Sequence, residues 1–200
     1  MNSPSSAAAS MMRELRAEVR QHLRSGRVIV AVDGTPGSGQ AEAADALAAA
    51  FVEDGATVLR ASASDFVEPG TTGHLDPDQL RRLLIEPFRA GSPSFSLAPT
   101  GEPATAPSDA VLIVDGDYLL GRDLRGMWNW SVWLEVHPTA AFARLAREGR
   151  GDADPAAESN ASLRDAAAAY RRASNPSAAA SALIENTDPE NPTRIFGDFC

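Results

Sequence analysis

Two adjacent stretches decide the fold, RVIVAVD at residues 27–33 and GTPGSGQA at residues 34–41. The first is a short run of mostly β-branched apolar residues, which is typical of a strand buried on both faces. The second is rich in glycine and leads into an alanine-rich stretch, residues 40–54, that indicates a helix ended by Gly55. A further apolar run at residues 56–61 follows. Strand, glycine loop, helix and strand together predict a right-handed βαβ unit.

The rest of the chain continues this alternation. Helices are expected within residues 7–25, 76–90, 138–148 and 161–173, and strands at residues 110–115, 131–136 and 182–186. Such an order favours an α/β fold with about five mostly parallel strands and helices on both faces. We expect residues 1–10 to be a disordered tail and residues 11–200 to be one domain, with a small lid around residues 144–176.

Composition narrows the range of partners. The formal net charge of −9 argues against nucleic acid, because binding a polyanion requires a basic face. No apolar run reaches the length of a membrane span, so no membrane partner is expected. The single cysteine, Cys200, cannot form an internal disulfide, which favours a reducing, cytoplasmic location. An anionic small molecule is still a possible ligand for a chain with this negative net charge, since a single loop can hold a phosphate.

The glycine-rich stretch is similar to the phosphate loop, whose pattern is Gly, four residues, Gly, Lys and then Ser or Thr. Its glycines allow backbone N–H groups to turn inward and form a nest for an anion at a helix N-terminus. Gln40 and Ala41 replace the lysine and the hydroxyl, and all eighteen basic residues of the chain are arginine. The predicted nucleotide-binding residues are Gly34, Thr35, Gly37, Ser38, Gly39, Gln40 and Ala41.

Several ordered segments resemble the uridine kinase group of P-loop nucleoside kinases. VAVDG at residues 30–34, with GSG at residues 37–39, looks like the family's VAVDGxxGSGKT. VLIVDGDYLL at residues 111–120 and WNWSVWLEV at residues 128–136 resemble its second acidic strand and its tryptophan-flanked strand. VLRASASDFVEP at residues 58–69 and IENTDPENP at residues 184–192 are similar to two further family segments.

The resemblance implies a nucleoside-kinase-like P-loop fold, ATP and Mg²⁺ as cofactors, and a nucleotide with a nucleoside as partners. It gives Asp115 the acidic position that orients Mg²⁺ through water. Ser64 occupies the position of the family's catalytic base, so the neighbouring Asp65 is the candidate base. Arg144 and Arg147 are the candidates for the lid arginines that contact the transferring phosphoryl group.

Three hypotheses for function follow. The first is a uridine-kinase-like nucleotide-binding protein in which ATP-dependent nucleoside phosphorylation is weak or lost, as in a pseudokinase. The second is an active nucleoside or small-molecule kinase with an atypical phosphate loop. The third is an interaction module without catalysis on a kinase scaffold. The loss of lysine, hydroxyl and base affects one reaction, which favours the first hypothesis.

Overall fold

The computed structural model describes residues 6–67 and 75–196. Its main sheet has six strands in the order β2-β5-β1-β6-β7-β8, of which β8 alone pairs antiparallel. The strands are β1 (Val28–Gly34), β2 (Val58–Ser62), β5 (Val111–Asp117), β6 (Trp130–Glu135), β7 (Ala182–Glu185) and β8 (Thr193–Ile195). The prediction of about five strands omitted β8, whose three residues are too few to show a period.

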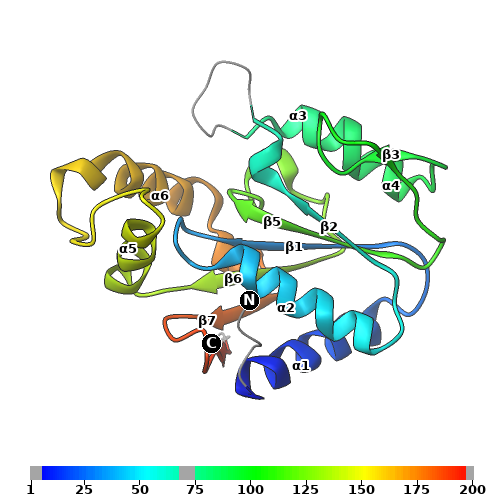
Figure 1. The fold of residues 1–200 in the computed structure, drawn as a ribbon, viewed down its shortest axis with the longest axis horizontal. Coiled ribbons are helices and arrows are strands. Elements are labelled where there is room, and N and C mark those ends of the chain that lie inside the picture. The colour runs from blue at the N-terminus through cyan, green and yellow to red at the C-terminus, as the bar shows by residue number, and fades with distance from the viewer. Residues whose placement is uncertain (1–5, 68–74, 197–200) are drawn as a thin grey trace.

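Helices cover both faces of this sheet, as Figure 1 shows. The helices are α1 (Ser6–His22), α2 (Gln40–Glu53), α3 (Pro77–Leu80), α4 (Glu86–Arg89), α5 (Pro138–Arg147), α6 (Ala161–Ser174) and α7 (Pro176–Ala179). A single π-helical stretch, Arg81–Ile85, joins α3 to α4. β3 (Phe95–Ser96) and β4 (Pro103–Ala104) form a separate two-stranded antiparallel hairpin.

The expected tail at residues 1–10 is wrong for residues 6–10, which form the first turns of α1. Met12, Leu15 and Val19 are buried against α2, and this packing extends the helix toward the N-terminus. Residues 1–5 and Cys200 lie outside the described residues. None of the described helices combines the length and the apolar composition needed to cross a membrane.

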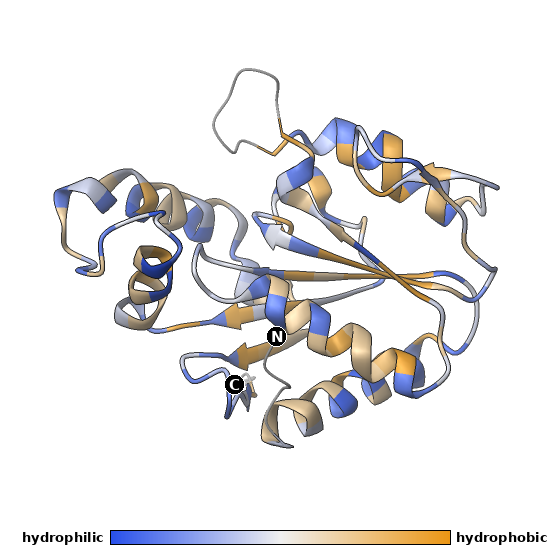
Figure 2. Ribbon diagram, viewed as in Figure 1, coloured by the Kyte–Doolittle hydropathy of each residue, from blue (hydrophilic) through white to orange (hydrophobic). Residues whose placement is uncertain are grey.

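The position of β1 in the middle of the sheet explains why its sequence is apolar without interruption, because both of its faces are buried. Val28, Val30 and Val32 face α1 and α2, whereas Ile29 and Ala31 face the α3–α4 side. Figure 2 shows the resulting hydrophobic strands between helices with polar outer faces. Because β1 lies between β5 and β6, all three strands bring their carboxyl ends to one edge of the sheet. That edge is where open α/β sheets bind ligands.

Candidate functional site: a phosphate loop with internally bonded side chains

The glycine-rich loop turns directly from β1 into α2. Gly37 and Gly39 adopt left-handed backbone conformations, with φ of +80° and +85°. The N–H of Ser38 donates to the carbonyl of Thr35 at 3.0 Å, and the N–H of Ala43 donates to the carbonyl of Gly39 at 3.0 Å. The predicted strand, loop and helix are therefore present, and only glycine tolerates two such φ values at this spacing without strain.

Arg144 and Asn186 hold the outer side of the loop. The guanidinium of Arg144 donates to the carbonyls of Gly37 and Ser38 at 3.2 Å each. The side-chain amide of Asn186 donates to the same Ser38 carbonyl at 2.7 Å. The C=O and N–H of a trans peptide point in opposite directions, so the N–H of Gly39 faces away from Arg144. This orientation agrees with the anion nest that the glycines predict, and the binding role of the loop stays a prediction.

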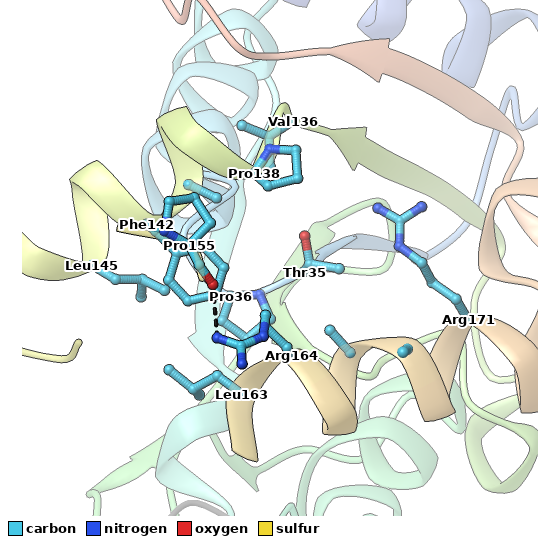
Figure 3. A pocket seen from close by; sticks show the side chains of 13 residues that line it. Thr35, Pro36, Val136, Pro138, Phe142, Leu145, Pro155, Leu163, Arg164 and Arg171 are labelled. Atoms are coloured by element: carbon cyan, nitrogen blue, oxygen red, sulfur yellow. Dashed lines mark hydrogen bonds between the residues drawn. The ribbon is translucent and has the colours of Figure 1, made fainter. Parts of the chain in front are cut away.

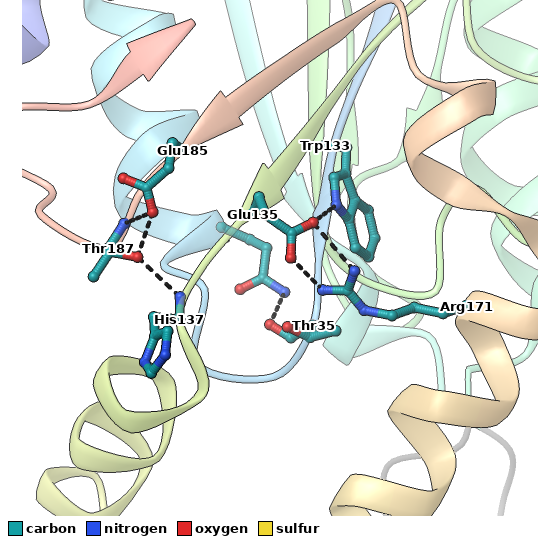
Figure 4. Close-up of polar contacts among 8 residues, drawn as sticks. Thr35, Trp133, Glu135, His137, Arg171, Glu185 and Thr187 are labelled. Atoms are coloured by element: carbon teal, nitrogen blue, oxygen red, sulfur yellow. Dashed lines mark hydrogen bonds and ion pairs between the residues drawn. The ribbon is translucent and has the colours of Figure 1, made fainter. Parts of the chain in front are cut away.

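Arg144 also connects this loop to the end of β7, where it donates to the carbonyls of Asn186 and Thr187 at 2.7 and 2.8 Å. Figure 4 shows the neighbouring contacts, in which the Thr187 hydroxyl accepts from the backbone N–H of His137 at 2.9 Å. Four carbonyl partners fix the guanidinium in a bracing role. The predicted contact between Arg144 and a phosphoryl group stays a prediction.

We expect Arg144→Met to lower the free energy of unfolding by about 2 kcal/mol, because four buried or half-buried carbonyls lose a charged donor. The matched control is Arg147→Met, since Arg147 is exposed and donates to Ala143 within its own helix. That control is expected to change stability by less than about 0.5 kcal/mol. Urea unfolding followed by tryptophan fluorescence measures both, and equal losses would contradict the bracing role.

Asp33 anchors the start of the loop. Its buried carboxylate accepts the N–H of Gly34 at 2.7 Å, the N–H of Leu120 at 2.9 Å and the hydroxyl of Tyr170 at 2.5 Å. Burial raises the pKa of Asp33 to about 7, against the lowering effect of its hydrogen bonds to Tyr170, Leu120 and Gly34. Because Tyr170 lies on α6, this single carboxylate ties the phosphate loop to the predicted lid.

Gln40 stands where the phosphate loop has lysine, and its amide is bonded inside the protein. The amide nitrogen donates to the carboxylate of Asp117 at 2.6 Å and to the carbonyls of Gly34 and Thr35 at 3.3 Å each. Burial raises the pKa of Asp117 to about 6, partly opposed by the charge of Arg150 and the bond from Gln40. Gln40 is therefore a link between the loop and β5 in this structure.

Asp115 lies at the end of β5, as predicted, but its carboxylate is paired within the chain. It forms an ion pair with Arg60 at 2.8 Å and accepts a long bond from the Ser62 hydroxyl at 3.4 Å. The side chain of Ala41 has no oxygen that could bind a metal ion. Within residues 6–67 and 75–196, no three His, Cys, Asp or Glu side chains gather closely enough to hold a metal ion. These residues do not fit the Mg²⁺ site that the resemblance implies.

A cavity of about 400 Å³ opens beside the loop at the carboxyl ends of the strands. Five of the eleven predicted site residues line it, together with several residues that the sequence did not indicate. Its lining is Gly37, Gly39, Gln40, Ala41, Glu42, Ser62, Ala63, Ser64, Leu75, Asp115, Gly116, Asp117, Tyr118, Glu148 and Arg150. The volume lies in the range of pockets that bind small molecules.

The candidate catalytic residues Asp65 and Arg147 were expected at the site, but they do not line the larger cavity. Asp65 is exposed and does not line the cavity, whereas its neighbour Ser64 does. Arg150 is the lid arginine that lines the cavity, and it pairs with Glu148 at 3.1 Å. The only hint in the sequence was that Arg150 lies three residues after Arg147, a spacing that places two helical residues on the same side. The roles of Asp65 and Arg147 in catalysis stay predictions.

Tyr118 is a second residue that sequence analysis missed. It lines the cavity with φ of +70°, a conformation that is strained for a tyrosine, and its ring packs edge-on against Tyr170 at 4.9 Å. Strained backbone of this kind clusters at ligand sites. No sequence signal marks φ, so only the structure identifies Tyr118.

A smaller cavity of about 250 Å³ lies between α5 and α6 and reaches Thr35 and Pro36 of the loop (Figure 3). Its walls are mainly apolar, including Phe142 and Leu145. Arg171 at its edge pairs with Glu135 at 2.7 Å, as Figure 4 shows. The predicted residue Thr35 therefore lines this second cavity, behind the phosphate loop.

No protein-family model matches the chain, and no curated protein matches its sequence. Solved structures match its fold. A possible uridine kinase from Bacillus stearothermophilus has a TM-score of 0.64 at 14% identity, over 87% of this chain and 97% of that one. A candidate fructose transport system kinase from Silicibacter sp. TM1040 has a TM-score of 0.58 at 22% identity, over 96% of this chain and 97% of that one.

The fold is therefore that of the P-loop kinases. Within them, it is similar to a uridine-kinase-like structure, which confirms the fold that the sequence resemblance implied. At sequence identities of 14% and 22%, the structural similarity establishes the fold only, and the activity has to be inferred from the residues of the site.

Proposed function

We propose that this protein binds a nucleotide through its phosphate loop, and that its transfer of phosphate to a nucleoside is weak or absent. One observation carries the proposal. Gly37 and Gly39 give the loop two left-handed residues directly before a helix N-terminus, which supports an anion nest, while the side chains of Gln40 and Asp115, at the lysine and metal positions, are bonded within the chain. The backbone therefore supports nucleotide binding, and the side chains support weak phosphoryl transfer.

Support for binding comes from the backbone. The carbonyls of Gly37 and Ser38 accept from Arg144, so the N–H of Gly39 faces away from that arginine. Gly39 and the first residues of α2 line the larger cavity. A helix N-terminus and inward N–H groups attract a phosphate without any charged side chain. The residues present therefore fit the phosphates of ATP or ADP, although they do not fit Mg²⁺.

Support for weak transfer comes from the side chains. Phosphoryl transfer depends on positive charge placed against the transferring group, which lysine, metal and arginine supply in this fold class. Gln40 is neutral, Ala41 has no hydroxyl, and Ser64 replaces the base. When bound with a metal, ATP supplies the phosphoryl group. Here the chain offers that group a nest of backbone donors and Arg150 at the cavity wall.

Arg150 favours the second hypothesis, an active kinase with an atypical phosphate loop. Its side chain lines the cavity and its charge lowers the pKa of Asp117, so it lies close to the Gln40 position. Arginine can stabilise the charge of a transferring phosphoryl group in place of lysine. The third hypothesis, an interaction module without catalysis, predicts that the protein binds no nucleotide. The cytoplasmic location stays a prediction.

Calorimetric titration with ADP and ATP, followed by a phosphotransfer assay with uridine and cytidine, tests the proposal. We expect saturable binding with turnover far below about 1 s⁻¹, the lower end of typical kinase rates. Turnover at ordinary kinase rates would establish the second hypothesis instead. An absence of binding at millimolar nucleotide would favour the interaction module.

A paired substitution tests the nest directly. Gln40→Lys with Ala41→Thr is expected to raise nucleotide affinity about tenfold, because a charged donor and a hydroxyl are added to an intact backbone cradle. The matched control is Gln21→Lys, which adds the same charge at an exposed position of α1. An equal gain in the control, or none in the paired variant, would contradict an intact nest.

A further inference from the structure

We infer that Arg60 supplies from within the chain the positive charge that a divalent cation would otherwise bring to Asp115, so that the phosphate ligand binds without a metal ion. The ligand part of this inference rests on the proposed function. The metal part concerns the carboxylate of Asp115 alone and can be tested without any nucleotide.

Arg60 is fixed in place by contacts on every side of its guanidinium. Its Nη2 lies 2.8 Å from Asp115, its Nε donates to Asp45 at 3.0 Å, and its Nη1 donates to the carbonyl of Ile113 at 3.1 Å. A longer bond of 3.4 Å reaches the carbonyl of Ala41 in the first turn of α2. These partners belong to β5 and α2, so the cation is part of the framework beside the cavity.

Burial makes the pair between Arg60 and Asp115 hard to separate. The side chain of Asp115 is 7% exposed and that of Arg60 is 25% exposed. A divalent cation at Asp115 would have to displace the guanidinium or bind beside a positive charge at close range. Both alternatives are costly, because removing one partner leaves a buried charge uncompensated and like charges repel strongly away from water.

Within the part of the chain that the structure describes, no three His, Cys, Asp or Glu side chains are grouped closely enough to hold the cation. Ala41 contributes a methyl group where a hydroxyl would reach the metal. Asp117 is bonded to the amide of Gln40 at 2.6 Å. Since Mg²⁺ requires several oxygen ligands in near-octahedral geometry, a carboxylate already paired with arginine does not provide a site. The chemical class of ligand that follows is a phosphate-bearing anion that is not carried as a metal complex.

The test is a titration of the folded protein with Mn²⁺ alone, read as the loss of the free Mn²⁺ signal in electron paramagnetic resonance. We compare the unmodified chain, Ala41→Ser, and Ala41→Ser with Arg60→Met. The hydroxyl alone is expected to give no binding, because Arg60 still occupies Asp115. The double variant is expected to bind Mn²⁺ at least about tenfold more tightly than Ala41→Ser.

The matched control is Ala41→Ser with Asp45→Asn. It removes the exposed carboxylate partner of Arg60 and leaves the pair with Asp115 intact, so no gain is expected. Circular dichroism verifies that each variant is folded. The inference is overturned if the unmodified chain or Ala41→Ser binds Mn²⁺ as tightly as the double variant, or if the folded double variant gains nothing. If the double variant does not fold, the unmodified chain and Ala41→Ser decide the outcome.

A second measurement uses the unmodified chain with ADP, in buffer with Mg²⁺ and in buffer with a chelator. The two dissociation constants are expected to agree within about twofold. An affinity that rises more than about fivefold with Mg²⁺ would overturn the inference. An absence of ADP binding in both buffers would contradict the proposed function instead, and the Mn²⁺ titration would still decide the role of Arg60.

Discussion

Replacing Asp33 with alanine is expected to lower the free energy of unfolding by about 3 kcal/mol or more. The substitution removes the carboxylate acceptor of the Gly34 N–H and of the Tyr170 hydroxyl, and it leaves the N–H of Leu120 with only its second acceptor, the Tyr170 hydroxyl at 3.0 Å. Each unsatisfied buried donor costs about 1–3 kcal/mol. Urea unfolding followed by tryptophan fluorescence measures the loss, since Trp133 packs near Tyr170 at 6.1 Å between ring centres.

The matched control is Tyr170→Phe, which removes one of the three donors and leaves the carboxylate with two. We expect it to cost about 1 kcal/mol. If alanine at position 33 were no more destabilising than phenylalanine at position 170, the anchoring role of Asp33 would be wrong. Because Asp33 joins β1 to α6, the alanine variant is also expected to weaken nucleotide binding more than the phenylalanine variant does.

Asp33 also predicts how stability depends on pH. Its pKa in the folded protein is raised from 3.8 to about 7 by burial, so the folded state retains a proton that the unfolded state releases. Stability is therefore highest below about pH 4 for this group and falls as the pH rises toward 7, by up to about 1.4 kcal/mol per pH unit. Asp33→Asn removes this group from the titration, so its unfolding free energy is expected to fall less over the same range.

The elements that the sequence predicted best are those whose burial is uniform. β1 and β5 are apolar because helices cover both of their faces, so their identity is visible in the residues alone. The same holds for α2, whose start is marked by the glycine-rich loop and whose end is marked by Gly55. β8 was missed because its pairing with β7 is a tertiary contact of three residues.

The sequence predicted the backbone of the candidate site, namely the strand, the glycine loop and the helix. It did not predict which side chains bond to one another there. The motif defines the place of the glycines and of Asp115 along the chain, and their binding roles stay predictions. Arg60 lies on β2 and reaches Asp115 across the sheet, and the register between Ser62 and Asp115 that sets this distance is not visible in the sequence. Asp117 accepts a hydrogen bond from the amide of Gln40, and this contact also depends on side-chain geometry that the sequence does not show.

Replacing Gly37 with alanine is expected to lower the free energy of unfolding by about 3 kcal/mol and to weaken nucleotide binding more than tenfold. The added Cβ would lie 2.5 Å from the carbonyl oxygen of Ala141 and 3.0 Å from its carbonyl carbon. These atoms are backbone of α5, so either the loop or the helix must move. Arg144 lies on the same helix and holds the loop carbonyls, and any movement of α5 therefore distorts the nest.

The matched control is Gly26→Ala. Gly26 has φ of +85°, close to the +80° of Gly37, but its added Cβ would meet nothing within 4 Å. The control therefore isolates the backbone strain of alanine in a left-handed conformation, about 1 kcal/mol. The difference between the two variants measures the close approach between loop and helix. Equal stability and equal ADP affinity in both would show that the contact with α5 does not shape the nest, and that the loop binds or fails to bind for another reason.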